Sequence, residues 1–158
     1  ARIDGDTWEK ISMEELVEQT HQRLLANLGP AALDVANLRW DFGDSGKTEI
    51  IGNPYVMIHG LCLVLKEAIR STVHEDKSVV LTLNPHEKHG VLCRIAYSPD
   101  IGAMEELEQL GQTGEDDLKS TLRTARAVLS DQGAGLRAYE EQSSKMKIVE
   151  ISFRGNPA

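Results

Sequence analysis

The sequence predicts an α+β fold, a two-layer sandwich in which a mixed sheet is covered on one face by three helices. Three segments, near residues 13–28, 54–73 and 118–130, each have a single apolar face at helical spacing. Pairs of short alternating segments, typical of strands, lie between them. Helices with one apolar face must cover a common sheet, which favours two layers.

The composition fits one globular domain over residues 1–158, with its core at about 11–153. Of 158 residues, 41% are hydrophobic and 27% are charged, and we find no internal repeat, linker or low-complexity segment. The net charge of −8 argues against binding to nucleic acid or to an anionic membrane surface.

No apolar run approaches the roughly 18 residues that could span a bilayer. We therefore expect a cytoplasmic location without direct membrane contact. Because the chain begins at Ala1 without a methionine, we also expect it to be a piece of a longer protein.

The first helix has clear start and stop signals. Ser12-Met13-Glu14-Glu15 is a capping box, in which Ser12 and Glu15 each accept from the other's backbone amide. Gly29-Pro30 ends the helix. Alternating polar and apolar residues then predict a strand over 36–42, followed by a turn at 43–46 and a short strand over 48–51.

The second helix begins at Asn53-Pro54, an N-cap followed by a proline at the first helical position. After it we expect a hairpin of strands 78–83 and 91–97 with an exposed tip, and then a long loop with a short helix near 104–110. After the third helix, strands 136–140 and 147–153 close the chain around a polar turn at 142–144.

This order of elements resembles the catalytic and ATP-binding domain of sensor histidine kinases, a GHKL ATPase domain with the Bergerat-type fold. Ile51-Gly52-Asn53-Pro54 resembles the turn before the N-box helix of that family. The segment 126–133 resembles its last helix and glycine stop, and residues 136–153 resemble its closing hairpin. The resemblance implies an ATP pocket formed by the second helix and the segment after strand 91–97.

The N-box of the family reads approximately Asn-Leu-Leu-x-Asn-Ala, and its second asparagine helps to hold Mg²⁺. Leu63 and Glu67 stand at the two asparagine positions. Glutamate supplies the oxygen that Mg²⁺ prefers, whereas leucine replaces no polar ligand. Glu67 and Arg70 are therefore the residues on this helix that the resemblance implies for a vestigial ATP and Mg²⁺ site.

The family's next motif, Asp-x-Gly-x-Gly, supplies an aspartate that accepts from the adenine amino group. Counting along strand 91–97 places Tyr97 there, whereas matching letters selects Asp100 and Gly102 and finds no second glycine. The phosphate-cradling glycines correspond to Lys119 and Thr121, whose side chains fill the space that a phosphate needs.

Other patterns have simpler interpretations. His21 faintly resembles the phosphorylated histidine of these kinases but lacks the acid after it, so we expect a solvent-facing side chain. His86 and His89, with His74, could hold a metal, but they are expected in exposed loops. The acidic segment 105–117 is expected to be a solvated contact surface rather than an acid/base pair.

Cys62 and Cys93 lie in apolar surroundings without a Cys-x-x-Cys motif, and we expect reduced core residues.

The sequence favours a degenerate histidine-kinase-type domain that acts in two-component-like signalling as a regulatory or docking module. It would bind nucleotide weakly or not at all, need no cofactor, and contact a response regulator or a kinase dimerisation domain. One alternative is an active domain for ATP-to-histidine phosphotransfer, with Glu67 on Mg²⁺ and Asp100 on adenine, so the enzyme assignment stays open. A second alternative is an unrelated α+β interaction domain.

Overall fold

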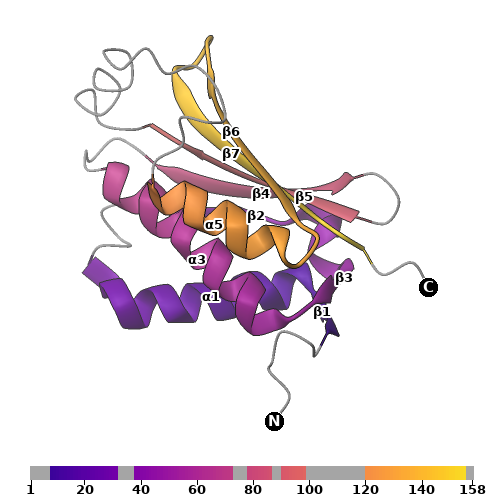
Figure 1. The fold of residues 1–158 in the computed structure, drawn as a ribbon. Coiled ribbons are helices and arrows are strands. Elements are labelled where there is room, and N and C mark those ends of the chain that lie inside the picture. The colour runs from indigo at the N-terminus through magenta and orange to yellow at the C-terminus, as the bar shows by residue number, and fades with distance from the viewer. Residues whose placement is uncertain (1–7, 32–37, 73–77, 87–89, 99–119, 156–158) are drawn as a thin grey trace.

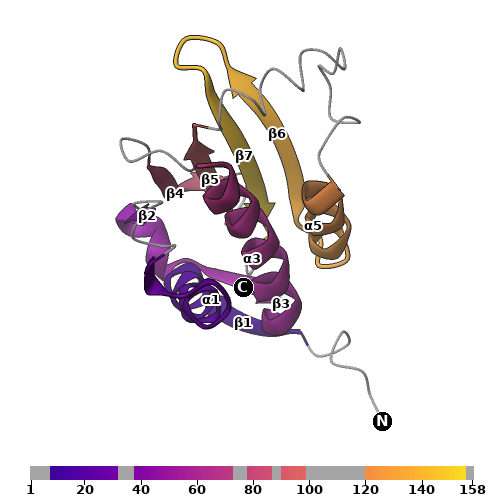
Figure 2. The ribbon, with the colours of Figure 1, turned by 90° about the vertical axis from the view of Figure 1, so that its left-hand side faces the viewer.

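The computed structural model of the chain describes residues 8–31, 38–72, 78–86, 90–98 and 120–155. Its three long helices lie together on one face of a five-stranded sheet, as Figures 1 and 2 show from two directions. The helices are α1 (Met13–Leu28), α3 (Pro54–Ser71) and α5 (Ser120–Ser130). The predicted two-layer α+β fold is confirmed.

The sheet is mixed, with the strand order β2-β4-β5-β7-β6. Its strands are β2 (Leu38–Asp41), β4 (Val79–His86), β5 (Gly90–Tyr97), β6 (Gly135–Glu141) and β7 (Met146–Phe153). β2 runs parallel to β4, and every other neighbouring pair is antiparallel. The chain crosses from β2 to β4 through α3, which covers the sheet on the way, as parallel pairs require.

Alternation along each strand separates a helix-facing side from an outer side. On β5, Cys93 and Ile95 are fully buried under the helices, whereas Leu92 and Arg94, which alternate with them, are half-buried on the outer side. α3 contributes the largest number of core side chains, and these follow the predicted apolar stripe: Met57, Leu61, Val64, Leu65, Ala68 and Ile69.

The caps of α1 and α3 were predicted largely correctly. Ser12 Oγ accepts from the backbone N–H of Glu15 at 3.1 Å, although the Glu15 carboxylate accepts from Gln19 instead of closing the capping box. Asn53 Oδ1 accepts from the N–H of Tyr55 at 3.0 Å. Each of these bonds satisfies a helix amide that has no partner within the helix.

The C-terminal end of α5 is tied to the N-terminal end of α3. Gly133 adopts φ +75° and lets Ala134 N–H reach Leu129 O at 3.0 Å, which closes the helix with a Schellman motif. This turn directs the buried side chain of Gln132 toward the α3 cap, where its Oε1 accepts from Asn53 N–H at 2.6 Å. The ends of two helices distant in sequence therefore share a hydrogen bond.

Strand β1 (Glu9–Ser12) was not predicted. It pairs antiparallel with β3 (Glu49–Gly52) in a separate two-stranded sheet. Only Ile11 of its side chains is buried, so the four residues lack an alternating pattern. Just before it, the half-exposed Trp8 contacts the Arg154 guanidinium, 6.0 Å from the ring centre.

Several predicted boundaries were wrong. The turn expected at 43–46 is part of a 3-10 helix, η2 (Gly43–Lys47). β4 continues through the expected hairpin tip to His86, which pairs with Gly90, because Pro85 is tolerated at the outer end of a strand. The short helix expected near 104–110 lies outside the described residues.

We predict that Gly60→Ala destabilises the fold. A Cβ atom at position 60 would lie 2.6 Å from Cγ of the fully buried Leu129 on α5. Overpacking costs about 1–3 kcal/mol and the better helix propensity of alanine returns about 1, so we expect the free energy of unfolding to fall by up to about 2 kcal/mol in urea denaturation.

The neighbouring exposed substitution His59→Ala is the matched control and should change stability by less than about 0.5 kcal/mol. Gly60→Ala should cost less in a Leu129→Ala background, because the clash is gone. Equal costs in both backgrounds would contradict the packing explanation.

Candidate functional site

The C-terminal half of α3 carries a buried carboxylate. Glu67 is 8% exposed, although carboxylates are rarely buried without a partner. Ser71, one turn later on the same helix, donates its hydroxyl to Glu67 Oε2 at 3.0 Å. The resemblance placed Glu67 at a ligand position, and in this fold it faces inward instead of lying on the solvated side of the helix.

Tyr97 ends β5 and packs with its ring in the helix-facing core, 2% exposed. Burial raises the pKa of its phenol, and the negative charge of Glu67 raises that pKa further. Counting along the strand had placed Tyr97 at the family's adenine-binding aspartate, and a buried aromatic ring occupies that position here.

Thr72 directly follows α3 and is also buried, 1% exposed. Its Oγ1 is the buried side-chain oxygen without a hydrogen-bond partner in the part of the chain that the structure describes. Glu67, Ser71, Thr72 and Tyr97 are thus buried polar residues at the end of α3 and at the end of β5, and we call these four residues the α3-end cluster. Its sequence signal was the break in apolar character at Glu67.

The other residues of the predicted site divide into two groups. Arg70 is exposed in the last turn of α3, and Leu63 is half-buried against the core. Thr121, expected in a phosphate loop, lies in the first turn of α5. The remaining predicted positions lie outside the described residues: Asp100, Gly102, Lys119 and the acidic segment 105–117.

The metal interpretation gains no support from the described residues. His86 is exposed at the end of β4, and the two other histidines of that interpretation, His74 and His89, fall outside the described ranges. Within those ranges, no three metal-binding side chains are grouped.

His21 was predicted to face solvent, and this was wrong. Its ring is half-buried and meets Trp40 of β2 edge-on, with ring centres 5.6 Å apart. The helical histidine therefore packs between α1 and the edge of the sheet. Trp40 in turn contacts Phe42, with ring centres 6.3 Å apart, so the three rings form an aromatic cluster.

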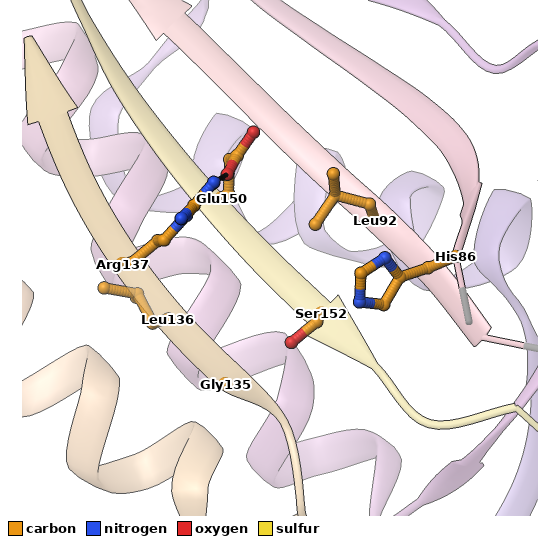
Figure 3. Close-up of a pocket in the computed structure, with 7 residues that line it drawn as sticks. All are labelled: His86, Leu92, Gly135, Leu136, Arg137, Glu150 and Ser152. Atoms are coloured by element: carbon orange, nitrogen blue, oxygen red, sulfur yellow. Dashed lines mark hydrogen bonds and ion pairs between the residues drawn. The ribbon is translucent and has the colours of Figure 1, made fainter.

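The outer face of the sheet contains a shallow hollow of about 430 Å³. Figure 3 shows the residues that line it: His86, Leu92, Gly135, Leu136, Arg137, Glu150 and Ser152. Gly135 and Ser152 are opposite each other on β6 and β7, and their small size leaves the space. The volume is at the lower end of the range for small-molecule sites.

Ion pairs cross the same face. Arg137 donates through Nε to Glu150 Oε1 at 2.8 Å, and Tyr139 donates to Glu150 Oε2 at 3.2 Å. Arg94 on β5 reaches Glu141 on β6 at 3.0 Å, although β7 lies between these strands. Sequence reasoning missed these contacts, because only the alternation of charge on β6 hinted at them.

Both cysteines are buried and unpaired, as expected. Burial raises the pKa of the Cys93 thiol from 9.0 to about 12, and it also raises the pKa of Cys62, with Arg23 and Lys66 opposing the shift. These thiols stay protonated at neutral pH, so neither is a nucleophile.

We predict opposite effects for two buried threonines. Thr72→Val removes an unpartnered hydroxyl and should leave the free energy of unfolding unchanged or raise it by up to about 1 kcal/mol. Thr20 is 0% exposed, and its Oγ1 donates to Leu16 O at 2.7 Å. Thr20→Val removes this hydrogen bond and should lower the free energy of unfolding by about 0.5–1.5 kcal/mol. A Thr72→Val variant less stable than Thr20→Val would show that the Thr72 hydroxyl has a partner.

We predict that stability falls above pH 9. The raised folded-state pKa of Cys93 means that the unfolded chain loses its proton first, so stability is complete below pH 9 and is lost as pH rises toward 12. The slope is about 1.4 kcal/mol per pH unit for each such group. Urea denaturation of Cys93→Ala between pH 8 and 10.5 should show a shallower decline than the parent; equal slopes would contradict the assignment.

Within the described ranges, no helix is long and apolar enough to cross a membrane. No family model matches the sequence, and no curated protein matches it.

Solved structures do resemble the fold. The Acinetobacter baumannii histidine kinase AdeS matches 99% of this chain and 70% of its own, with a TM-score of 0.69 at 16% identity. The mycobacterial sensor histidine kinase MprB matches 96% of this chain and 100% of its own, with a TM-score of 0.69 at 13% identity.

Histidine kinase ThkA, solved in complex with the response regulator protein TrrA, matches 95% of this chain and 42% of its own. Its TM-score is 0.65 at 12% identity. The chain therefore has the fold of histidine kinase catalytic domains.

Proposed function

We propose that the chain is a degenerate histidine-kinase-type ATP-binding domain, one domain over residues 1–158, that serves as a docking or regulatory module in two-component-like signalling. The fold supports a kinase-type module. The observation that carries the proposal of weak or absent nucleotide binding is the α3-end cluster.

Two features of that cluster oppose an ATP–Mg²⁺ complex. The carboxylate of Glu67 is 8% exposed and accepts from Ser71 within the apolar layer, so a hydrated Mg²⁺ ion would have to lose water and enter that layer to reach it. If the adenine acceptor is assigned by counting along β5, Tyr97 stands at its position, and its aromatic ring is buried in the core. Leu63 adds no polar group. An apolar side chain such as that of Leu63 cannot make the hydrogen bonds of the polar residue that the resemblance implies at its position.

The proposed partner is a protein, either a response regulator or a kinase dimerisation domain. ThkA, whose catalytic-domain fold this chain shares, was solved with a response regulator protein. A docking role requires a stable surface and no turnover, and the intact helical layer and sheet provide such a surface. The net charge of −8 favours a partner with a basic contact face and makes the association salt-sensitive.

We predict that isothermal titration with ATP and Mg²⁺ gives a dissociation constant of roughly 1 mM or weaker, a binding free energy near −4 kcal/mol or less favourable. The matched variant Glu67→Asn, with the side chain that the family uses, should bind no more tightly on its own, because Tyr97 still fills the adenine position. The double variant Glu67→Asn with Tyr97→Asp should bind more tightly than either single variant.

Thermal melts of each variant without nucleotide serve as the control for folding. Saturable, Mg²⁺-dependent binding to the parent chain at low micromolar concentration would overturn the proposal. It would favour the alternative of a working ATP-to-histidine kinase domain that uses Glu67 for Mg²⁺ and Asp100 for adenine.

A further inference from the structure

Strand β6 is the last strand of the sheet order and, among the described strands, pairs only with β7. Figure 2 shows it at the border of the sheet, beyond β7. An edge strand presents a row of backbone N–H and C=O groups that a further strand can pair with. The seven residues of β6 are enough for a short intermolecular ladder.

The outward side chains of β6 have an alternating pattern that is complementary to itself. Arg137, Tyr139 and Glu141 occupy every second position on the outer face, with the cation at one end and the anion at the other. Tyr139 stands midway. In an antiparallel pair of two such strands centred on Tyr139, each Arg137 would lie directly opposite Glu141 of the second copy.

We propose that β6 pairs antiparallel with β6 of a second copy of this chain, with the two-fold axis at Tyr139. The pairing joins two five-stranded sheets into one continuous sheet, with the helices of both copies on the same side. An isologous contact of this kind uses the same patch twice. On its outer face, two tyrosine rings meet at the centre, and an oppositely charged pair lies on each side of them.

The ion pairs within each copy extend this arrangement. Glu150 contacts Arg137 at 2.7 Å, and Glu141 contacts Arg94 at 3.0 Å. Across the contact, the order becomes Glu150, Arg137, then Glu141 and Arg94 of the second copy. Signs alternate along the whole row, so no charge gives up its present partner to gain a new one. Directly opposite pairs of opposite charge, and aromatic pairs, each contribute about 0.2–1 kcal/mol.

Other registers are less favourable. In the register that places Arg137 opposite Arg137 of the second copy, two positive charges meet. In the registers that place Glu140 opposite Glu140, or Glu141 opposite Glu141, two negative charges meet. The register centred on Ala138 leaves Glu141 opposite Gly135, without a cation. The charges of β6 therefore select one alignment instead of blocking the edge. Each copy carries a net charge of −8, so the copies repel at low ionic strength and the contact is weak.

Sedimentation velocity from about 10 µM to 1 mM, at about 0.15 M salt, tests the proposal. The parent chain should shift from monomer toward dimer as its concentration rises. Tyr139→Lys should weaken the dimer at least tenfold, because it places two ammonium groups at the axis. Within each copy the new lysine can still contact Glu150, which Tyr139 contacts now, so the monomer stays folded.

Tyr139→Phe is the matched control. It loses the bond to Glu150 but keeps the ring at the axis, and it should dimerise as the parent does. A parent chain that stays monomeric to 1 mM would overturn the proposal, as would a Tyr139→Lys variant that dimerises like the parent.

The register is tested by Tyr139→Cys. Opposite Cβ atoms in an antiparallel pair lie about 4.5–5.5 Å apart, and a disulfide needs about 3.5–4.5 Å. A small local approach of the two strands at the axis therefore lets the two thiols form a disulfide between copies under an added oxidant. Cys62 and Cys93 are buried and do not compete. Ser143→Cys, in the exposed turn beyond β6, is the control and should cross-link much more slowly. Equal rates at the two positions would contradict the proposed axis.

Discussion

The close approach of α3 to α5 is the constraint on which the rest of the helical layer depends. Gly60 has no side chain, and the Leu129 isobutyl group fills the space that a Cβ atom would take. Once the helices are this close, Gln132 reaches the amide of Asn53 and joins the end of one helix to the cap of the other. Packing and hydrogen bonding thus reinforce each other, and α3 can lie flat across the centre of the sheet.

This position of α3 has a chemical consequence at its other end. A helix that buries a continuous face against a sheet also buries any polar residue on that face, and Glu67 is such a residue. Burying a carboxylate is unfavourable unless hydrogen bonds compensate, and Ser71 supplies one. A group held in this way is a poorer metal ligand than one that faces a solvated cleft. This burial of Glu67 is what supports the proposal of weak nucleotide binding in a chain with the fold of histidine kinase catalytic domains.

The two faces of the sheet are stabilised by different kinds of interaction. The helix-facing side is held by apolar contacts, which are strong and undirected. The outer side relies on ion pairs, and Arg94 must stretch across β7 to reach Glu141, passing over Ile148, which is only 1% exposed. Long charged side chains can cover apolar surface in this manner. The outer face thereby presents paired charges to solvent above the buried Ile148.

The sequence alone determined the elements whose signals are local. The three helices, the hairpin of β4 and β5, and the closing hairpin follow from periodicity, and the N-caps at Ser12 and Asn53 follow from residue type. The resemblance to histidine kinase domains followed from the order of these elements, because order survives when individual side chains change. The sequence also showed that Leu63 and Glu67 stand at the two positions where the resemblance implies asparagine ligands.

Tertiary structure decided everything that depends on residues far apart in the chain. β1 has too little apolar character to be recognised and exists only because β3 offers it an edge. His21 was expected in solvent, but Trp40 approaches it from a distant strand. The effect of the Glu67 charge on the pKa of Tyr97 was likewise invisible, since it depends on how α3 crosses β5. Local patterns specify which face of an element is buried, whereas only the packed chain specifies what that face meets.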